Sequence, residues 1–425
     1  MSNNKTVGIY TLGCRVNQYE SCAIAELLKA RGYIIKKQGE CDYYIVNTCA
    51  VTAESERKSR QLVRRFAKNS KVLVIGCASQ IDNSYNDIPN VIYVGGNVNK
   101  TAVVDVITKD KDYDKYSVLD IQNAVYEPMS LSMKDEIFSE CRAFIKIQDG
   151  CNGKCTYCII PKCRGRVRSR DFDEIIDEAK RLVSVGYSEI ILTGIEVSAY
   201  NKAPLYKLID TLSTVDGLKR LRLGSLSPNI INEKFLVSVA KSKNFMPHFH
   251  LSLQSCCDGV LKGMQRPYRK ADIFNRIEAI RRYVPNAMIS ADIIVGFPGE
   301  TEEDFIETMN ALTELQIFHV HSFPYSERKG TVAAEMANSV PRNIRAERNT
   351  RLIEALTETK GTILDSFVGK TVSVLIEKII DGIAFGHTGE FLEASFEAKS
   401  CDVGDIINII ITGHNDSVLN GEIDN

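Results

Sequence analysis

The sequence predicts an α/β protein in three parts: an N-terminal parallel α/β domain (residues 1–115), an open parallel barrel of six βα units (140–365) and a small all-β barrel (366–425), with a linker at 116–139. In the first two parts, short apolar runs alternate with amphipathic helical patterns, which is typical of parallel sheets. The third part has only short apolar runs separated by polar turns, which is typical of a small barrel.

Composition narrows the class of protein. A chain of 425 residues is long enough for two or three domains, and its formal net charge of −1 neither favours nor excludes a nucleic-acid partner. No apolar stretch is long enough to cross a bilayer, and the N-terminus lacks the apolar segment of a signal peptide, so we expect a cytoplasmic protein without membrane association. Thirteen cysteines in such a chain favour metal ligation over disulfides.

One loop carries the strongest chemical signal. Cys151, Cys155 and Cys158 directly follow an expected strand at 143–147, and closely spaced thiolates select zinc or an iron–sulfur cluster. Structural zinc takes four ligands, and the nearest fourth candidate, Cys163, is separated from the loop by a proline. We therefore favour a four-iron cluster that leaves one iron open.

An aromatic residue, Tyr157, precedes the last cysteine of this loop. The loop is similar to that of radical S-adenosylmethionine (SAM) enzymes, in which the open iron chelates SAM. Tyr157 is expected to pack against the cluster or the SAM adenine, and an ordinary core role is equally compatible with the sequence.

A second group of cysteines is expected at one sheet edge. Strands predicted at 7–13, 43–47 and 72–76 are each followed closely by a cysteine, namely Cys14, Cys49 and Cys77. The carboxyl ends of parallel strands share one edge, where ligands bind. The alternative is that these are ordinary buried cysteines, as Cys22 and Cys41 are expected to be.

Polar and glycine residues mark the strand ends of the predicted barrel, where barrel active sites are built. They suit the ribose and amino-acid groups of SAM, although each alone could be a turn or cap residue. The candidates for SAM binding are Gly194, Glu196, Ser227, Gln254 and Asp292.

Basic residues concentrate beside the two cysteine groups and predict phosphate binding. The final barrel is acid-rich instead, which disfavours indiscriminate phosphate binding. The basic groups are Arg57, Lys58, Arg60, Arg64 and Arg65; Lys162, Arg164, Arg166, Arg168 and Arg170; and Arg266, Arg269 and Lys270 around Tyr268.

These motifs together resemble the methylthiotransferases over nearly the whole chain. That family combines an N-terminal auxiliary-cluster domain, a radical SAM barrel and a C-terminal TRAM domain. Residues 10–21, 47–52 and 323–326, with 330–331, are similar to the branch that acts on tRNA bearing N6-threonylcarbamoyladenosine at position 37.

The resemblance implies two [4Fe–4S] clusters, one on Cys14, Cys49 and Cys77 and the other on the loop cysteines. SAM would supply both a methyl group and a radical, and the reaction would place a methylthio group on C2 of the modified adenine. An unpaired anticodon-loop base can be splayed into a pocket for this chemistry. We also expect an electron donor protein as partner, and a monomer.

Two alternatives stay open at this point. The same chemistry could act on ribosomal protein S12, whose basic character would suit an acidic tail domain, or the chain could be a non-catalytic cluster or zinc protein that binds RNA. Cys256 and Cys257 stand where the family usually has a glycine and a polar residue, and Cys141 and Cys163 have no family role.

Overall fold

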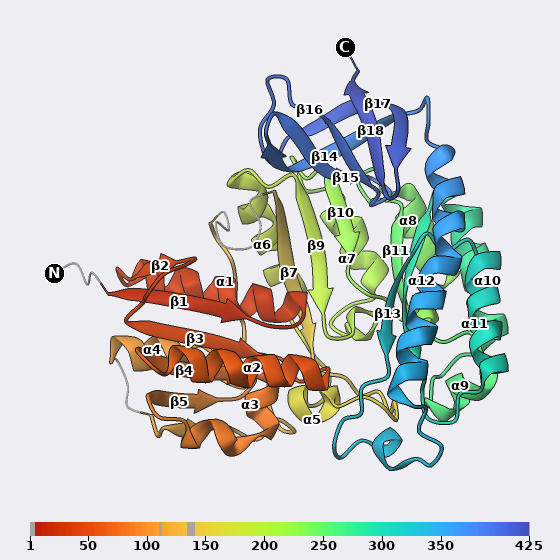
Figure 1. The fold of residues 1–425 in the computed structure, drawn as a ribbon. Helices are drawn as coiled ribbons and strands as arrows, with labels where there is room; N and C mark the ends of the chain where they lie inside the picture. Colours follow the sequence, from red (N-terminus) through yellow and green to blue (C-terminus); the bar gives the residue numbers. More distant parts are fainter. Residues whose placement is uncertain (1–4, 110–112, 134–140, 425) are drawn as a thin grey trace.

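The computed structural model describes residues 5–109, 113–133 and 141–424, and its three parts follow the order of the chain (Figure 1). A parallel N-terminal sheet leads into a partial barrel, and a small β-barrel sits at one end of that partial barrel. The predicted fold class is confirmed. The limits of the parts stay predictions, and residues 110–112 and 134–140 of the expected connection lie outside the described residues.

The N-terminal sheet has the order β2-β1-β3-β4-β5-β6, with every pair parallel. Its strands are β1 (Thr6–Thr11), β2 (Ile34–Lys36), β3 (Tyr43–Thr48), β4 (Lys71–Gly76), β5 (Val91–Gly95) and β6 (Tyr116–Ser117). Its helices are α1 (Arg15–Ala30), α2 (Ala53–Phe66), α3 (Cys77–Ile81) and α4 (Ala102–Thr108).

The sequence predicted three of these six strands. Every residue of β3 is buried, as expected for a central parallel strand covered on both faces. By contrast β2 has three residues at the sheet edge, two of them exposed, and β6 has only two residues. Such short edge strands carry little apolar signal. The strand β5 was also missed, although it is an apolar run.

The partial barrel has six parallel strands in the order β7, β9, β10, β11, β12, β13. Two isolated bridges, Leu221 to Phe245 and Leu226 to Leu251, connect β10 to the segment around β11. The strands are β7 (Arg142–Asp149), β9 (Glu189–Gly194), β10 (Arg220–Leu223), β11 (His248–Gln254), β12 (Met288–Val295) and β13 (His319–Pro324), and the short β8 (Arg168–Ser169) pairs antiparallel with β7.

Helices connect these strands and cover the outside of the partial barrel (Figure 1). They are α5 (Ile160–Arg164), α6 (Phe172–Ser184), α7 (Leu205–Leu212), α8 (Glu233–Lys241), α9 (Asp258–Gly263), α10 (Lys270–Tyr283), α11 (Glu302–Glu314) and the long α12 (Arg342–Asp365). The short α5 and α9 were not predicted, because five or six residues cannot show a helical period.

The C-terminal part is a closed barrel in the order β14-β15-β16-β18-β17, so the predicted small β-barrel is confirmed. Its strands are β14 (Thr371–Ile380), β15 (Ile383–Thr388), β16 (Glu393–Glu397), β17 (Ile406–Asn415) and β18 (Val418–Ile423). The sequence missed β18, whose Asn and Gly interrupt the apolar pattern.

Buried arginines join this β-barrel to the partial barrel. Arg222 donates to the carbonyls of Thr388 at 2.8 Å and Gly389 at 2.9 Å, and Arg220 donates to the carbonyl of Ser373 at 2.7 Å. Burial opposes ionisation of Glu189 at the start of β9, but Arg222, Arg142 and Arg220 lower its pKa. The contact between the two barrels is therefore a buried cluster of charged side chains. Backbone carbonyls of the β-barrel accept the hydrogen bonds that the arginines of this cluster donate.

Along the part of the chain that the structure describes, no helix combines the length and the apolar content that a membrane crossing requires.

Candidate functional site

The N-terminal cysteines meet at the carboxyl ends of three neighbouring strands. Cys14 is the N-cap of α1 after β1, Cys49 directly follows β3, and Cys77 is the first residue of α3 after β4. Because β1, β3 and β4 are adjacent in the sheet, the expected single edge is present. The backbone at Gly13, where φ is +95°, passes close to Cys49. A Cβ added at Gly13 would lie 2.7 Å from Sγ of Cys49.

The thiols of this group also influence one another. Burial raises the pKa of Cys49 to about 11, and the charges of Cys77 and Cys14 add to that effect. No group of three Cys, His, Asp or Glu side chains among the described residues converges tightly enough to hold a single metal ion. Three neighbouring thiols are the kind of ligand set that holds an iron–sulfur cluster, in which each cysteine binds a different iron.

A buried arginine contacts this group from the partial barrel. Nε of Arg164 donates to Sγ of Cys77 at 3.4 Å, and the remaining guanidinium nitrogens bond to Glu20, Asp149 and Asn17. Burial opposes ionisation of Glu20, yet Arg164 and the neighbouring lysines hold its pKa well below the usual range.

The charges around Arg164 do not cancel. Lys146 Nζ lies 2.6 Å from Glu20 and 2.7 Å from Asp149. Lys100 also pairs with Glu20 and Arg168 with Asp149, so together with Arg164 four cations face two carboxylates. This buried excess of positive charge lies beside Sγ of Cys77. An anionic thiolate-bound cluster would balance it, so the residues present fit such a group.

The second cysteine group lies in the loop after β7. Backbone N–H of Gly153 donates to Sγ of Cys151 at 3.3 Å, and a Cβ added at Gly153 would lie 3.1 Å from that sulfur and 3.8 Å from Sγ of Cys155. Nη1 of Arg266 donates to Sγ of Cys155 at 3.2 Å. Burial raises the pKa of Cys158 to about 12, with the other two thiols contributing. A glycine cradle and a cationic donor therefore surround the three thiols, as a cluster ligand set requires.

Tyr157 packs against the apolar group that includes Met264 and Phe297. Burial raises its pKa well above the usual value. The structure thus places it in a small core behind the cysteine loop, and its expected contact with SAM stays a prediction.

Four of the predicted SAM-binding residues lie at or just after strand ends, whereas Asp292 lies within β12, and the five do not share a single cavity. Gly194 and Asp292 line a cavity of about 580 Å³ together with Cys14, whereas Glu196, Ser227 and Gln254 do not line it. Backbone N–H of Glu196 donates to Gln148 at 2.8 Å, and burial raises the pKa of the Glu196 carboxyl. Gln254 ends β11 with φ +69°, a conformation that is costly outside glycine and that clusters at functional sites.

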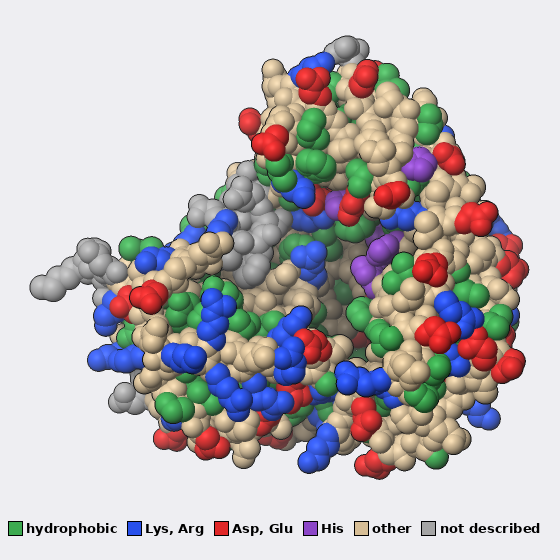
Figure 2. Space-filling view, viewed as in Figure 1, with side chains coloured by type: hydrophobic (Ala, Val, Ile, Leu, Met, Phe, Trp, Pro, Cys, Tyr) green, Lys and Arg blue, Asp and Glu red, His purple; other side chains and the backbone are tan. Residues whose placement is uncertain are grey.

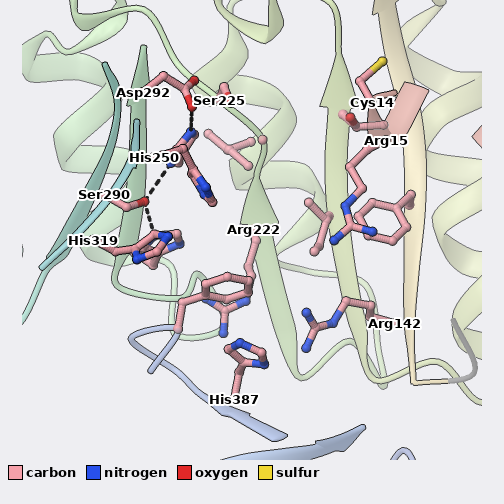
Figure 3. Close-up of a pocket in the computed structure, with 18 of the residues that line it drawn as sticks. Cys14, Arg15, Arg142, Arg222, Ser225, His250, Ser290, Asp292, His319 and His387 are labelled. Carbon is pink, nitrogen blue, oxygen red and sulfur yellow. Dashed lines mark hydrogen bonds and ion pairs between the residues drawn. The ribbon is translucent and has the colours of Figure 1, made fainter. Parts of the chain in front are cut away.

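The cavity is bounded by all three parts of the protein, and it appears as the central hollow in Figure 2. Cys14 and Arg15 lie on one side, and His250, Ser290, Asp292 and His319 lie on the opposite side (Figure 3). The β-barrel contributes His387, which Figure 3 shows, and Phe391 also lines the cavity. Of the first cysteine group, Cys14 therefore borders a space large enough for a small organic group.

The histidines of this cavity were not predicted as site residues. Nε2 of His250 lies 3.1 Å from Asp292, and both His248 and His250 bond to the hydroxyl of Ser290. Burial lowers the pKa of His319 to about 4, with neighbouring charges adding to the effect. Alternating histidines in the predicted strands at 248–253 and 318–323 were the signal, because such side chains share one face.

One of the three predicted phosphate-binding groups is wrong in large part. Arg164, Arg168 and Arg170 are buried, and they pair with Glu20, Asp149 and Glu178. In the third group Arg266 faces Cys155, and Tyr268 is buried. Arg57, Lys58, Arg64 and Arg65 of α2 remain exposed, and blue side chains gather over this part of the surface in Figure 2.

Comparisons with known proteins agree with this geometry. Residues 145–312 match the family described as the radical SAM superfamily, and residues 6–93 match the uncharacterized protein family UPF0004. The radical SAM methyltransferase TsrM from Kitasatospora setae superimposes with a TM-score of 0.57 at 16% identity, covering 78% of this chain and 75% of TsrM. The partial barrel and its cysteine loop thus define a radical SAM enzyme.

Curated relatives narrow the family. The threonylcarbamoyladenosine tRNA methylthiotransferase MtaB of Bacillus subtilis is 33% identical, covering 96% of this chain and 93% of the relative, and its namesake in Thermotoga maritima is 35% identical, covering 92% and 91%. The tRNA-2-methylthio-N(6)-dimethylallyladenosine synthase of Clostridium novyi is 34% identical, covering 99% and 97%.

The chain therefore belongs to the radical SAM tRNA methylthiotransferases and is MtaB-like. Iron–sulfur clusters and SAM are its cofactors, and tRNA is its substrate. The relatives differ in the group that their names place on N6 of the target adenosine.

Proposed function

We propose that this enzyme converts N6-threonylcarbamoyladenosine at position 37 of tRNA into its 2-methylthio derivative, with SAM as the source of both the methyl group and the radical. Cys151, Cys155 and Cys158 would hold the SAM-binding [4Fe–4S] cluster. Cys14, Cys49 and Cys77 would hold the auxiliary one. We further propose that the enzyme works as a monomer in the cytoplasm, and that an electron donor protein reduces it.

The observation that supports this proposal is the cavity that joins Cys14 to the strand ends and to the β-barrel. When bound, the clusters and SAM supply the electron, the hydrogen abstraction, the sulfur and the methyl group. The protein has to bring one unpaired adenine to these groups and exclude water from it. A cavity of about 580 Å³ that borders Cys14 and is bounded by all three parts suits that task.

The polarity of the cavity favours an ionised substituent on the adenine. Arg15, Arg142, Arg222 and Lys360 line it together with five histidines, and two carboxylates, Asp292 and Glu393, also line it, so the ionised arginines and lysine outnumber the acids. A carboxylate such as that of the threonylcarbamoyl group is stabilised among cations, whereas a dimethylallyl group would gain nothing from them. A ribosomal protein substrate is not favoured, because the curated relatives described above are all named for tRNA modification.

Mass spectrometry of tRNA nucleosides from cells with and without the gene tests the proposal. Loss of 2-methylthio-N6-threonylcarbamoyladenosine with accumulation of its precursor is the expected result. An unchanged nucleoside profile, or loss of the dimethylallyl derivative instead, would contradict it. Anaerobic incubation of the reconstituted enzyme with SAM and a reductant should also yield 5′-deoxyadenosine, which a binding protein would not produce.

A further inference from the structure

We propose that Arg15 binds the carboxylate of the N6 substituent of the target adenosine and thereby selects threonylcarbamoyladenosine over adenosines with an apolar substituent. The inference rests on the proposed function, because it takes adenosine 37 of tRNA as the substrate. It goes further by naming the side chain that distinguishes two substrates with the same reacting carbon.

The position of Arg15 is the first argument. It is the first residue of α1 and directly follows Cys14, and both residues line the central cavity. Its guanidinium carbon lies 5.0 Å from the centroid of the Phe144 ring, and Nη1 donates to Oε1 of Gln18 at 2.8 Å. Figure 3 shows the Arg15 side chain on the same side of the cavity as Cys14. The contacts with Phe144 and Gln18 thus hold the guanidinium in place, and its position in the cavity leaves it accessible to a ligand.

The charges of the cavity are the second argument. Arg142 pairs with Glu189 at 3.1 Å and with Glu377, and Arg222 pairs with Glu189 at 3.0 Å. Within the described residues Arg15 forms no ion pair with a carboxylate, and its one polar side-chain partner is an amide. An incoming carboxylate would give this guanidinium the anionic hydrogen-bonding partner that it lacks among the described residues.

The structure of adenine is the third argument. C2, which receives the sulfur, and C6, which carries the substituent on N6, both flank N1 on the Watson–Crick edge. When C2 faces the sulfur site at Cys14, the N6 substituent lies on the same edge, within reach of the residue next to Cys14. The planar fork of an arginine binds a carboxylate through two parallel hydrogen bonds.

The same arrangement disfavours a dimethylallyl group. That group has no acceptor, and inserting it would remove water from the guanidinium without replacing the lost hydrogen bonds. Sites built to hydrogen-bond a polar substrate group reject analogues without that group more strongly than apolar pockets reject an added polar group. One residue can therefore provide much of the selectivity.

The test compares R15Q, R15K and R31Q with the wild-type holoenzyme. Arg31 lies at the opposite end of α1, outside the cavity, so R31Q is the matched control. Affinity is measured for two anticodon stem-loop RNAs that differ only in whether adenosine 37 carries the threonylcarbamoyl group. Turnover is measured on the modified RNA, and iron is quantified in every variant.

We expect the wild type and R31Q to prefer the modified RNA. In R15Q that preference should fall by about 10- to 100-fold, as expected for losing a hydrogen-bonded charge pair. KM should rise more than kcat falls, and R15K should recover part of the preference. R31Q should keep the wild-type rate of 5′-deoxyadenosine formation in the absence of RNA.

Two results would overturn the inference. One is an R15Q enzyme that keeps the wild-type preference, and the other is an equal loss of affinity for both RNAs, which indicates a structural role. A loss of preference in K360Q but not in R15Q would assign the role to the other unpaired cation of the cavity. If instead the wild type neither prefers nor methylthiolates the modified RNA, the proposed function itself fails.

Discussion

Nε of Arg164 donates a hydrogen bond to Sγ of Cys77 across 3.4 Å, and Nη1 of the same guanidinium lies 3.1 Å from Asp149. Cys77 begins α3 in the N-terminal part, whereas Asp149 ends β7 just before the loop of Cys151. One buried side chain thus connects the two cysteine groups. A substitution at one cysteine group is therefore expected to affect the surroundings of the other.

The first prediction concerns this connection. In R164K the shorter ammonium cannot contact Cys77, Glu20 and Asn17 together, and the buried carboxylate loses part of its compensation. We expect the free energy of unfolding to fall by about 3 kcal/mol or more. Chemical denaturation of the apo-protein measures it. R57Q, at an exposed site on α2, should change stability by less than about 0.5 kcal/mol, and equal effects would contradict the prediction.

The second prediction separates the two cysteine groups. Replacing Cys14, Cys49 and Cys77 with alanine should reduce anaerobically reconstituted iron from about eight to about four atoms per chain. The variant should still form 5′-deoxyadenosine but should no longer insert sulfur into tRNA.

Iron analysis and nucleoside mass spectrometry check both outcomes of this replacement. C401S is the matched control, because Cys401 lies in the β-barrel part away from both groups. If the triple variant kept all of its iron, the assignment of the auxiliary site would be wrong.

The third prediction concerns pH. Burial, with the charges of His321, Lys360 and His250, lowers the pKa of His319 to about 4 from about 6.5. Between these values the unfolded chain binds more protons than the folded one, so this contribution to stability is complete above about pH 6.5 and is lost as the pH falls toward 4. The pKa values of His248 and His321 are lowered in the same direction by burial.

We therefore expect H319Q to lose less stability than the wild type between pH 7 and pH 5, by about 1 kcal/mol once the partial exposure of the ring is taken into account. Denaturant unfolding at each pH provides the measurement. H414Q changes a histidine that pairs with Asp365 outside the cavity, and it should follow the wild-type curve. Identical slopes for all three proteins would show that the cavity histidines do not titrate as the fold implies.

The fourth prediction concerns the exposed cations of α2. If Arg64 and Arg65 contact tRNA phosphates, R64Q/R65Q should weaken binding and reduce the slope of log affinity against log salt by about 1 to 2. Titration of labelled tRNA at several salt concentrations measures the slope. R282Q lies on α10 at the outside of the partial barrel and should keep the wild-type slope, so equal slopes in the two variants would exclude α2 as a phosphate-binding surface.

Local patterns were enough to predict the architecture and both cysteine groups. Alternating strand and helix periods gave the parallel order, and cysteines at strand ends had to meet at one edge. Arg164, Arg168 and Arg170 show where such patterns fail. Their spacing suggested a basic surface, but partners such as Glu20, 144 residues away, neutralise and bury them, and only the folded chain brings these groups together.

Arg15 shows a second limit of prediction from local sequence patterns. Its sequence neighbour Cys14 was predicted as a ligand, but nothing in the local pattern showed that its side chain would share a cavity with strands near residues 250 and 290. The histidines did have a local signal in their alternation. That alternation alone does not predict a site, because partly buried histidines are common without any function.

The anchoring of the β-barrel by Arg220 and Arg222 has a practical consequence for dissecting the protein. Their guanidinium groups use backbone carbonyls of the C-terminal part as permanent acceptors. Expressing residues 1–365 alone would leave these donors and Glu189 facing water in a groove shaped for another domain. We therefore expect such a fragment to misassemble or precipitate, and RNA contacts of the C-terminal part are better mapped by point changes in the intact chain than by deletion.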